Sequence, residues 1–308
     1  MAKVVLFIVA IWIASCQTSA QLDVRREVTF NTVKKSILAE GGSIEMFSKA
    51  GSFRYKEMLN FQIPISPEDV LSTDLFLSQH DDYAPLLVIQ HGNLADKSVH
   101  EYQARLAATW GFHVLVVSQT NEKRWIRNGH NLARLVSLLR SWPEILGSHF
   151  NPDQIILVGH SFGGSAVAIA AGSGEDVAGV IFLDPALYSP AVKKYLSNMK
   201  APALLLGADP KVFMSRSRAT FYALPDKIAE VSFRGATHND AQYPSQFLWE
   251  ELFMLVPKPV EERQRYFAAG IVLGSFAFAS PKSNKLTFAW NALVKAKQKG
   301  IVATARKK

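Results

Sequence analysis

The chain has 308 residues, of which 48% are hydrophobic, so it carries enough apolar material for a folded core and is not expected to be disordered. Its formal net charge is +8, but the 26 acidic residues all lie at or before Glu262, whereas the 46 residues after it contain ten Lys or Arg and no acid. The body of the chain is therefore close to neutral, which argues against a nucleic-acid-binding body, and the basic end is compatible with contact to an anionic membrane surface.

The first 20 residues have the features of an export signal. Lys3 precedes an apolar run at 4–14 that is too short to span a bilayer, and small and polar residues follow it. Cys16 is the single cysteine of the chain; it follows Ile-Ala-Ser, as in the bacterial lipobox, and cannot form an internal disulfide. We expect either a lipoprotein of the periplasm or cell envelope that is lipidated at Cys16, or a secreted protein cleaved after Ala20.

From about residue 60 the chain alternates short apolar runs with amphipathic stretches, a pattern typical of parallel α/β sheets. The expected strands, of which the first two form a hairpin, are 61–65, 74–78, 86–90, 113–118, 155–158, 180–183, 203–207 and 228–233. The expected helices are 99–110, 128–142, 163–171, 246–256 and 261–279. The sequence thus predicts an α/β fold with a mostly parallel central sheet flanked by helices.

Two further expectations concern the C-terminal part of the chain. The apolar stretch 266–279 is short for a membrane span, so we expect helix 261–279 to pack on the sheet. We place the folded domain at 21–280 and assign 281–308 to a basic C-terminal tail.

The most informative motif follows the apolar run 155–158, where the chain reads Gly-His-Ser-Phe-Gly around Ser161. This is the G-x-S-x-G pattern in a strand–turn–helix context, which lifts a nucleophilic serine above the end of a sheet. The turn is so tight that only small residues fit beside the serine, and Gly164, Ser165 and Ala166 follow it. Ser161 is therefore predicted to be a catalytic nucleophile.

A serine hydroxyl is a weak nucleophile unless a base accepts its proton and a third group orients that base. His238 follows the last predicted strand and is the candidate base, and a serine–acid–histidine chain order is one that hydrolases use. Asp184 and Asp209 end two successive strands, each directly before a proline, and either can be the acid. Asp240 is expected to stabilise its own loop, and His160 to pack or hydrogen-bond within the elbow.

An oxyanion hole needs two main-chain amides that point at the developing negative oxygen. The residue after the nucleophile, Phe162, is one candidate. The other is Asn93 in the turn after strand 86–90, where Gly92 permits a sharp bend.

These motifs occur together in the α/β-hydrolase superfamily, which the chain resembles over roughly residues 60–255. Within that superfamily it is most similar to the branch of platelet-activating-factor acetylhydrolases, chlorophyllases and related bacterial esterases. In that branch, as in pancreatic-type lipases, the acid follows the strand after the elbow, which implies Asp184; cutinase-like polyester hydrolases take it from the next strand, which would imply Asp209. Unlike chlorophyllases, the chain has no cysteine after the histidine loop, so pigment hydrolysis is not implied.

The sequence therefore predicts an exported serine esterase with Ser161, Asp184 and His238 as its catalytic triad. The expected substrate is a small-molecule or lipid ester, and a lipidated Cys16 or the basic tail could associate the protein with a membrane surface. No cofactor and no metal is expected, because no cluster of His, Cys or Asp has ligand spacing. The alternatives are a peptidase or amidase with the same triad, and a non-catalytic binding protein on a hydrolase scaffold.

Overall fold

The fold is taken from a computed structural model that describes residues 29–80, 82–119, 125–147, 150–186, 190–212, 217–245 and 258–307. The predicted export signal, with Cys16 and Ala20, lies outside these residues, as does the predicted helix 246–256.

A nine-stranded sheet runs through the centre of the described structure, in the order β1-β2-β4-β3-β5-β6-β7-β8-β9. The strands from β4 to β8 in this order are parallel, and β1, β2 and β9 pair in antiparallel fashion. The strand bounds are β1 (Tyr55–Pro64), β2 (Val70–Ser78), β3 (Ala84–Gln90), β4 (His113–Ser118), β5 (Phe150–His160), β6 (Gly179–Leu183), β7 (Ala203–Gly207), β8 (Lys227–Phe233) and β9 (Val302–Lys307). The predicted fold class and the predicted hairpin, now β1 and β2, are confirmed.

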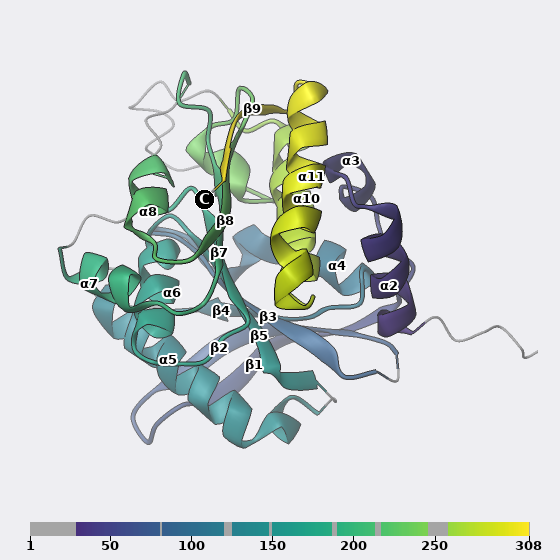
Figure 1. Cartoon of the computed structure of the whole chain (residues 1–308). Helices are drawn as coiled ribbons and strands as arrows, with labels where there is room; N and C mark the ends of the chain where they lie inside the picture. The colour runs from purple at the N-terminus through teal and green to yellow at the C-terminus, as the bar shows by residue number, and fades with distance from the viewer. Residues whose placement is uncertain are drawn as a thin grey trace, which may run out of the picture.

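Helices cover both faces of the sheet (Figure 1). One face is covered by α2 (Phe30–Glu40), α3 (Ile44–Phe47), α4 (Glu101–Thr109), α10 (Glu261–Phe278) and α11 (Lys282–Gln298). The other face is covered by α5 (Trp125–Ser141), α6 (Phe162–Gly172), α7 (Pro190–Asn198) and α8 (Ser217–Ala223). Because helices cover both faces, strands β3, β6 and β7 are buried at every position.

Strand β3 illustrates this burial on both faces. Leu87 and Ile89 pack into the core on the α10 face, whereas Leu86 and Val88 pack into the core on the α6 face. Because successive strand residues point to opposite faces, a strand covered on both sides reads as a continuous apolar run rather than an alternating one.

Helix α10 is the segment predicted to pack on the sheet, and the structure confirms this. Its residues from Phe267 to Phe278 are buried, and Phe267, Ile271 and Phe276 belong to the same core as Leu204 and Leu206 of β7. None of the helices in the described ranges combines the length and the hydropathy that crossing a membrane requires.

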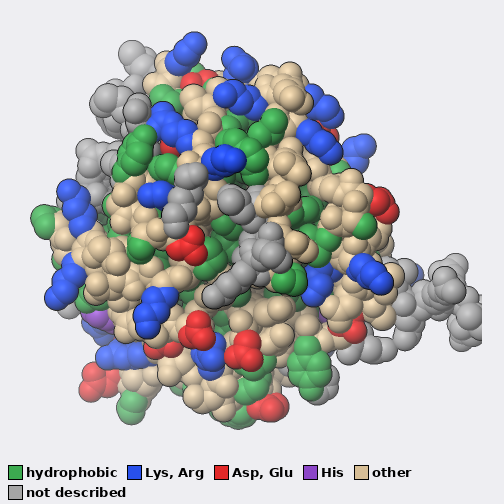
Figure 2. Space-filling view, in the orientation of Figure 1, with side chains coloured by type: hydrophobic (Ala, Val, Ile, Leu, Met, Phe, Trp, Pro, Cys, Tyr) green, Lys and Arg blue, Asp and Glu red, His purple; other side chains and the backbone are tan. Residues whose placement is uncertain are grey.

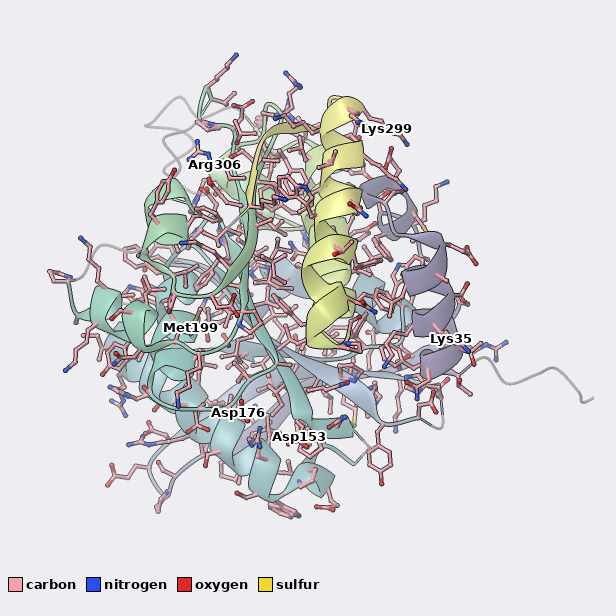
Figure 3. The ribbon with its side chains drawn as sticks, in the orientation of Figure 1. Lys35, Asp153, Asp176, Met199, Lys299 and Arg306 are labelled. Carbon is pink, nitrogen blue, oxygen red and sulfur yellow. The ribbon has the colours of Figure 1, made fainter. Side chains whose placement is uncertain are left out.

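The C-terminal segment differs from the predicted basic tail, because residues 282–307 belong to the fold. Helix α11 buries Ala289 and Leu293, and β9 pairs with β8 as an edge strand of the sheet. The apolar positions of α11 recur every three or four residues between lysines, so the segment is amphipathic rather than a solvated tail. Figure 3 places Lys299 and Arg306 at the end of the molecule opposite Asp153 and Asp176, and in Figure 2 Lys and Arg side chains gather around α11 and β9.

Candidate active site

Ser161 occupies a tight turn between the end of β5 and the first residue of α6. Its backbone has φ 52° and ψ −122°, in the left-handed half of conformational space that non-glycine residues rarely adopt. Three main-chain hydrogen bonds hold it there: its amide donates to the Leu183 carbonyl at 3.1 Å, and its carbonyl accepts from Gly164 at 3.0 Å and Ala186 at 2.8 Å. The strain of about 1–3 kcal/mol expected for such a residue is therefore offset by bonds to the neighbouring strand and helix.

The turn after β3 lies directly against this serine. A Cβ atom on Gly92 would lie 2.8 Å from Ser161 Cβ, and a Cβ on Gly163 would lie 2.4 Å from the carbonyl oxygens of Gln90 and His91. Only glycine fits at both positions without moving backbone or the serine itself.

The two predicted oxyanion donors flank this contact. Asn93 follows Gly92, and Phe162 is the first residue of α6, where the leading amides of a helix have no intrahelical acceptor. The structure thus brings Asn93 and Phe162 to the same serine from two different elements. Their role as oxyanion donors stays a prediction.

His238 forms a close pair with the buried Asp184. Atom Nδ1 of His238 lies 2.6 Å from Oδ2 of Asp184, whose side chain is 2% exposed. The other carboxylate oxygen, Oδ1, accepts from the Ala208 amide at 3.1 Å. Since a carboxylate accepts, Nδ1 of His238 carries the proton that it donates, and Nε2 is the nitrogen left to exchange protons with a substrate or nucleophile.

Asp209 has a different set of partners. Its carboxylate accepts from the amides of Gly235 at 2.8 Å and Lys211 at 3.0 Å, and its own amide donates to the Ala236 carbonyl at 2.8 Å. Asp209 therefore holds the backbone that leads into the histidine loop.

Asp240 also serves the loop that carries His238. Its carboxylate accepts from the amides of Thr237 at 2.6 Å and Val260 at 2.7 Å, and so caps the short helix η3 (His238–Ala241). This matches the expectation that Asp240 stabilises its own loop.

His160 connects the elbow to the histidine loop. Its ring centroid lies 4.6 Å from that of His238, and its Nε2 lies 3.2 Å from the His238 carbonyl oxygen. Because His160 directly precedes Ser161, the segments that carry Ser161, Asp184 and His238 meet at the carboxyl ends of β5, β6 and β8. Parallel sheets commonly place their sites at such an edge.

A second buried histidine, which the sequence did not point to, lies behind His160. The ring of His100 is fully buried, 6.0 Å from the ring of His160, and burial lowers the pKa of His100 to about 4. Burial likewise lowers the pKa of His160 well below 6.5, and the neighbouring His238 and His100 add to the effect. Both rings are therefore neutral at pH 7.

No sequence signal could have found His100, because it reaches the site through the ring of His160 and, by way of Gln103, the carbonyl of Ala241, which both belong to distant segments. Its Nδ1 donates to Oε1 of Gln103 at 2.7 Å, and Gln103 in turn donates to the carbonyl of Ala241, 138 residues later.

Within the described ranges, no group of three or more His, Cys, Asp or Glu side chains could hold a metal ion.

An aromatic pair lies at one of the predicted oxyanion donors, Phe162. The ring of Trp125 stacks on that of Phe162, with centroids 4.9 Å apart and planes 13° from parallel. Leu94 and Ile126, which follow Asn93 and Trp125 in the chain, are 50% and 43% exposed. The neighbourhood of the serine therefore offers apolar surface.

A family model described as the alpha/beta hydrolase family matches residues 80–296. The matched range contains all three predicted triad residues and both predicted oxyanion donors. It does not distinguish the branches of the superfamily, so the similarity to platelet-activating-factor acetylhydrolases and chlorophyllases stays a prediction. No curated protein matches the chain.

Proposed function

The chain belongs to the alpha/beta hydrolase family, and on that premise we propose that it is a serine hydrolase that cleaves carboxylic esters through an acyl-enzyme. The observation that carries the proposal is the 2.6 Å contact between His238 Nδ1 and Asp184 Oδ2. Asp184 lies between Leu183 and Ala186, which both hydrogen-bond the main chain of Ser161 in its strained elbow. A paired and oriented imidazole beside such a serine is the arrangement that nucleophilic catalysis requires.

In the proposed reaction, Oγ of Ser161 attacks the ester carbonyl carbon while Nε2 of His238 takes the hydroxyl proton. Asp184 holds the imidazole in the tautomer whose Nε2 is unprotonated and accepts, and stabilises the imidazolium that forms. The amides of Asn93 and Phe162 bind the negative oxygen of the tetrahedral intermediate. His238 then returns the proton to the departing alkoxide, which leaves as the alcohol.

The acyl group now remains on Ser161. A water molecule loses a proton to His238 and attacks the acyl carbon, and collapse of the second intermediate releases the acid and restores the serine hydroxyl. The apolar surface of Trp125, Phe162 and Leu94 supports an ester with an apolar acyl or alcohol group, either a small molecule or a lipid.

The direct test compares the wild type with Ser161→Ala on a short p-nitrophenyl ester and on the corresponding anilide. We expect ester turnover by the wild type only, and a fluorophosphonate probe should label the wild type but not Ser161→Ala. Ser173→Ala, just after the end of the same helix, is the matched control and should keep full activity, since its hydroxyl donates to the Ile169 carbonyl of that helix. Unchanged turnover by Ser161→Ala would refute the mechanism, and faster anilide than ester cleavage would favour an amidase.

Export also remains part of the proposal. Mass spectrometry of the mature protein from its native cell would show a lipid-modified N-terminus at Cys16 in the lipoprotein form, or an unmodified one at Gln21 in the secreted form. An intact Met1 in the mature protein would contradict export by either route.

A further inference from the structure

A buried cluster of polar side chains lies behind the histidine loop, and the proposed chemistry uses none of them. Its members come from five separate elements or loops, and each is at most 5% exposed: His100, Gln103, His160, Gln242 and Gln264. Polar groups are costly in a core unless they are hydrogen-bonded. The hydrogen bonds of such a cluster hold the segments that they join in fixed positions.

The bonds of His160 determine where its proton lies. Its Nε2 lies 3.2 Å from the main-chain carbonyl oxygen of His238, and a carbonyl can only accept, so Nε2 carries the proton and donates it. Nδ1 is then an acceptor, and it accepts from the side-chain amide of Gln242 at 3.1 Å. One imidazole thus ties the base loop to the nucleophile elbow.

Two further glutamines hold the chain just after His238. Gln264 on α10 donates to the Gln242 carbonyl at 2.7 Å, and Gln103 on α4 donates to the Ala241 carbonyl at 2.8 Å. The base loop is therefore anchored from the elbow, from α4 and from α10. Of these three anchors, only His160 is adjacent in sequence to the nucleophile.

The charge state of His160 matters because its ring is so close to that of His238. The titratable groups that act on it are His238, His100 and His91, and burial keeps the pKa of His160 well below 6.5. His238 becomes positively charged during the proposed reaction, 4.6 Å away between ring centroids. A neutral His160 can keep its hydrogen bond to the loop without repelling that charge.

We infer that His160 is a positioning residue: through its Nε2–H it holds the main chain of His238 in register with Ser161, and the Gln242 amide keeps it in the donating tautomer. This inference rests on the proposed serine hydrolase. Its consequence is that a donor at position 160, and not an imidazole as such, is required for the base to reach the nucleophile.

The test compares His160→Leu, which removes the donor, with His160→Gln, whose amide nitrogen can still donate at the same reach. A misplacement of about 1 Å between reacting groups can cost about 100-fold in rate. We expect kcat per active site to fall about 10- to 100-fold in His160→Leu with KM within about twofold, and to fall less than about fivefold in His160→Gln. Gln242→Met should lower kcat in the same direction, since it leaves the ring in place but removes the group that sets its tautomer.

Active sites are counted by titration with a fluorophosphonate, so that a variant that merely folds less well loses sites but not kcat per site. His80→Leu and His80→Gln form the matched control pair, because His80 Nε2 also bonds a main-chain carbonyl, that of Gly111 at 3.0 Å, in the turn before β4. Both control variants should keep the wild-type kcat per site.

The inference is overturned if His160→Leu keeps the wild-type kcat per site, or if His160→Gln is as impaired as His160→Leu. If His160→Leu does not fold, a wild-type kcat per site in Gln242→Met overturns it. Failure of the proposed function is a separate outcome, because the wild type itself would then show no Ser161-dependent turnover. In that case nitrogen-15 NMR of the histidine rings still decides: a ring of His160 protonated at Nδ1 rather than Nε2 overturns the inference.

Discussion

Replacing Asp184 with Asn should nearly abolish activity, and the structure shows why. The Oδ1 atom of Asp184 accepts from the Ala208 amide, so in Asp184→Asn the remaining carbonyl oxygen must face that amide. The new NH₂ group then faces Nδ1 of His238, 2.6 Å from Oδ2 in the wild type. Nδ1 must switch from donor to acceptor, which moves the ring proton to Nε2.

A proton on Nε2 prevents His238 from accepting the serine proton. A serine protease in which the corresponding Asp was replaced by Asn loses about 10⁴-fold in kcat for the same reason. We expect a loss of the same order for Asp184→Asn, equivalent to about 5 kcal/mol in the activation free energy.

Asp209→Asn is the matched comparison, because Asp209 ends the neighbouring strand. Its two oxygens accept from the amides of Gly235 and Lys211, so the Asn side chain keeps one of these bonds and loses the other. The loss of one such bond to a buried carboxylate costs about 1–3 kcal/mol of stability and should change activity less than about tenfold. Both variants are measured by kcat/KM on a p-nitrophenyl ester, with thermal melting to verify folding; equal losses in the two variants, or a loss below tenfold in Asp184→Asn, would refute the reasoning.

Three further predictions follow from buried and edge positions. Gly163→Ala should destabilise the fold by about 1–3 kcal/mol in urea unfolding, because its Cβ would lie 2.4 Å from two main-chain oxygens; an unchanged midpoint would contradict this close approach. The buried His100 stays neutral down to about pH 4, whereas the imidazole of His100 in the unfolded chain binds a proton below about pH 6.5. The stability that the neutral ring contributes to the unfolding free energy is therefore present above pH 6.5 and is lost as the pH falls toward 4. That loss is about 3 kcal/mol, and the unfolding free energy of His100→Gln should depend less on pH over this range than that of the wild type. Truncation after Gly300 removes β9, exposes the edge of β8 and should lower the melting temperature by about 5 °C or more, whereas loss of a solvated tail would leave it unchanged.

Much of the fold could be predicted from local sequence patterns. The strands at the centre of the sheet are short runs of apolar residues, and burial on both faces makes such runs unambiguous when helical stretches separate them. The ends of the strands were predicted less well than their centres. The strand predicted at 155–158 extends over Phe150–His160, because the pairing of β5 with β3 continues beyond the apolar centre of β5.

The composition of the C-terminal segment hides its part in the fold. Lysines dominate its composition, but Phe288, Ala289 and Leu293 of α11 are buried against the rest of the core. Strand β9 has few large apolar residues and forms because β8 offers it an unpaired edge. That partner is a property of the assembled sheet and is not visible in residues 302–307.

The elbow around Ser161 was determined by the sequence alone, because a sharp strand-to-helix turn depends on small residues within a few positions of the serine. Which aspartate meets His238 was decided only by the tertiary structure: Asp184 and Asp209 end adjacent strands in similar local contexts, and the path of the loop after β8 brings the imidazole to one and the Gly235 amide to the other. The same holds for the bonds that His160 and the buried glutamines make to other segments, which lie up to 138 residues apart. Contacts of this kind depend on how the sheet and helices pack, and no spacing within the chain encodes them.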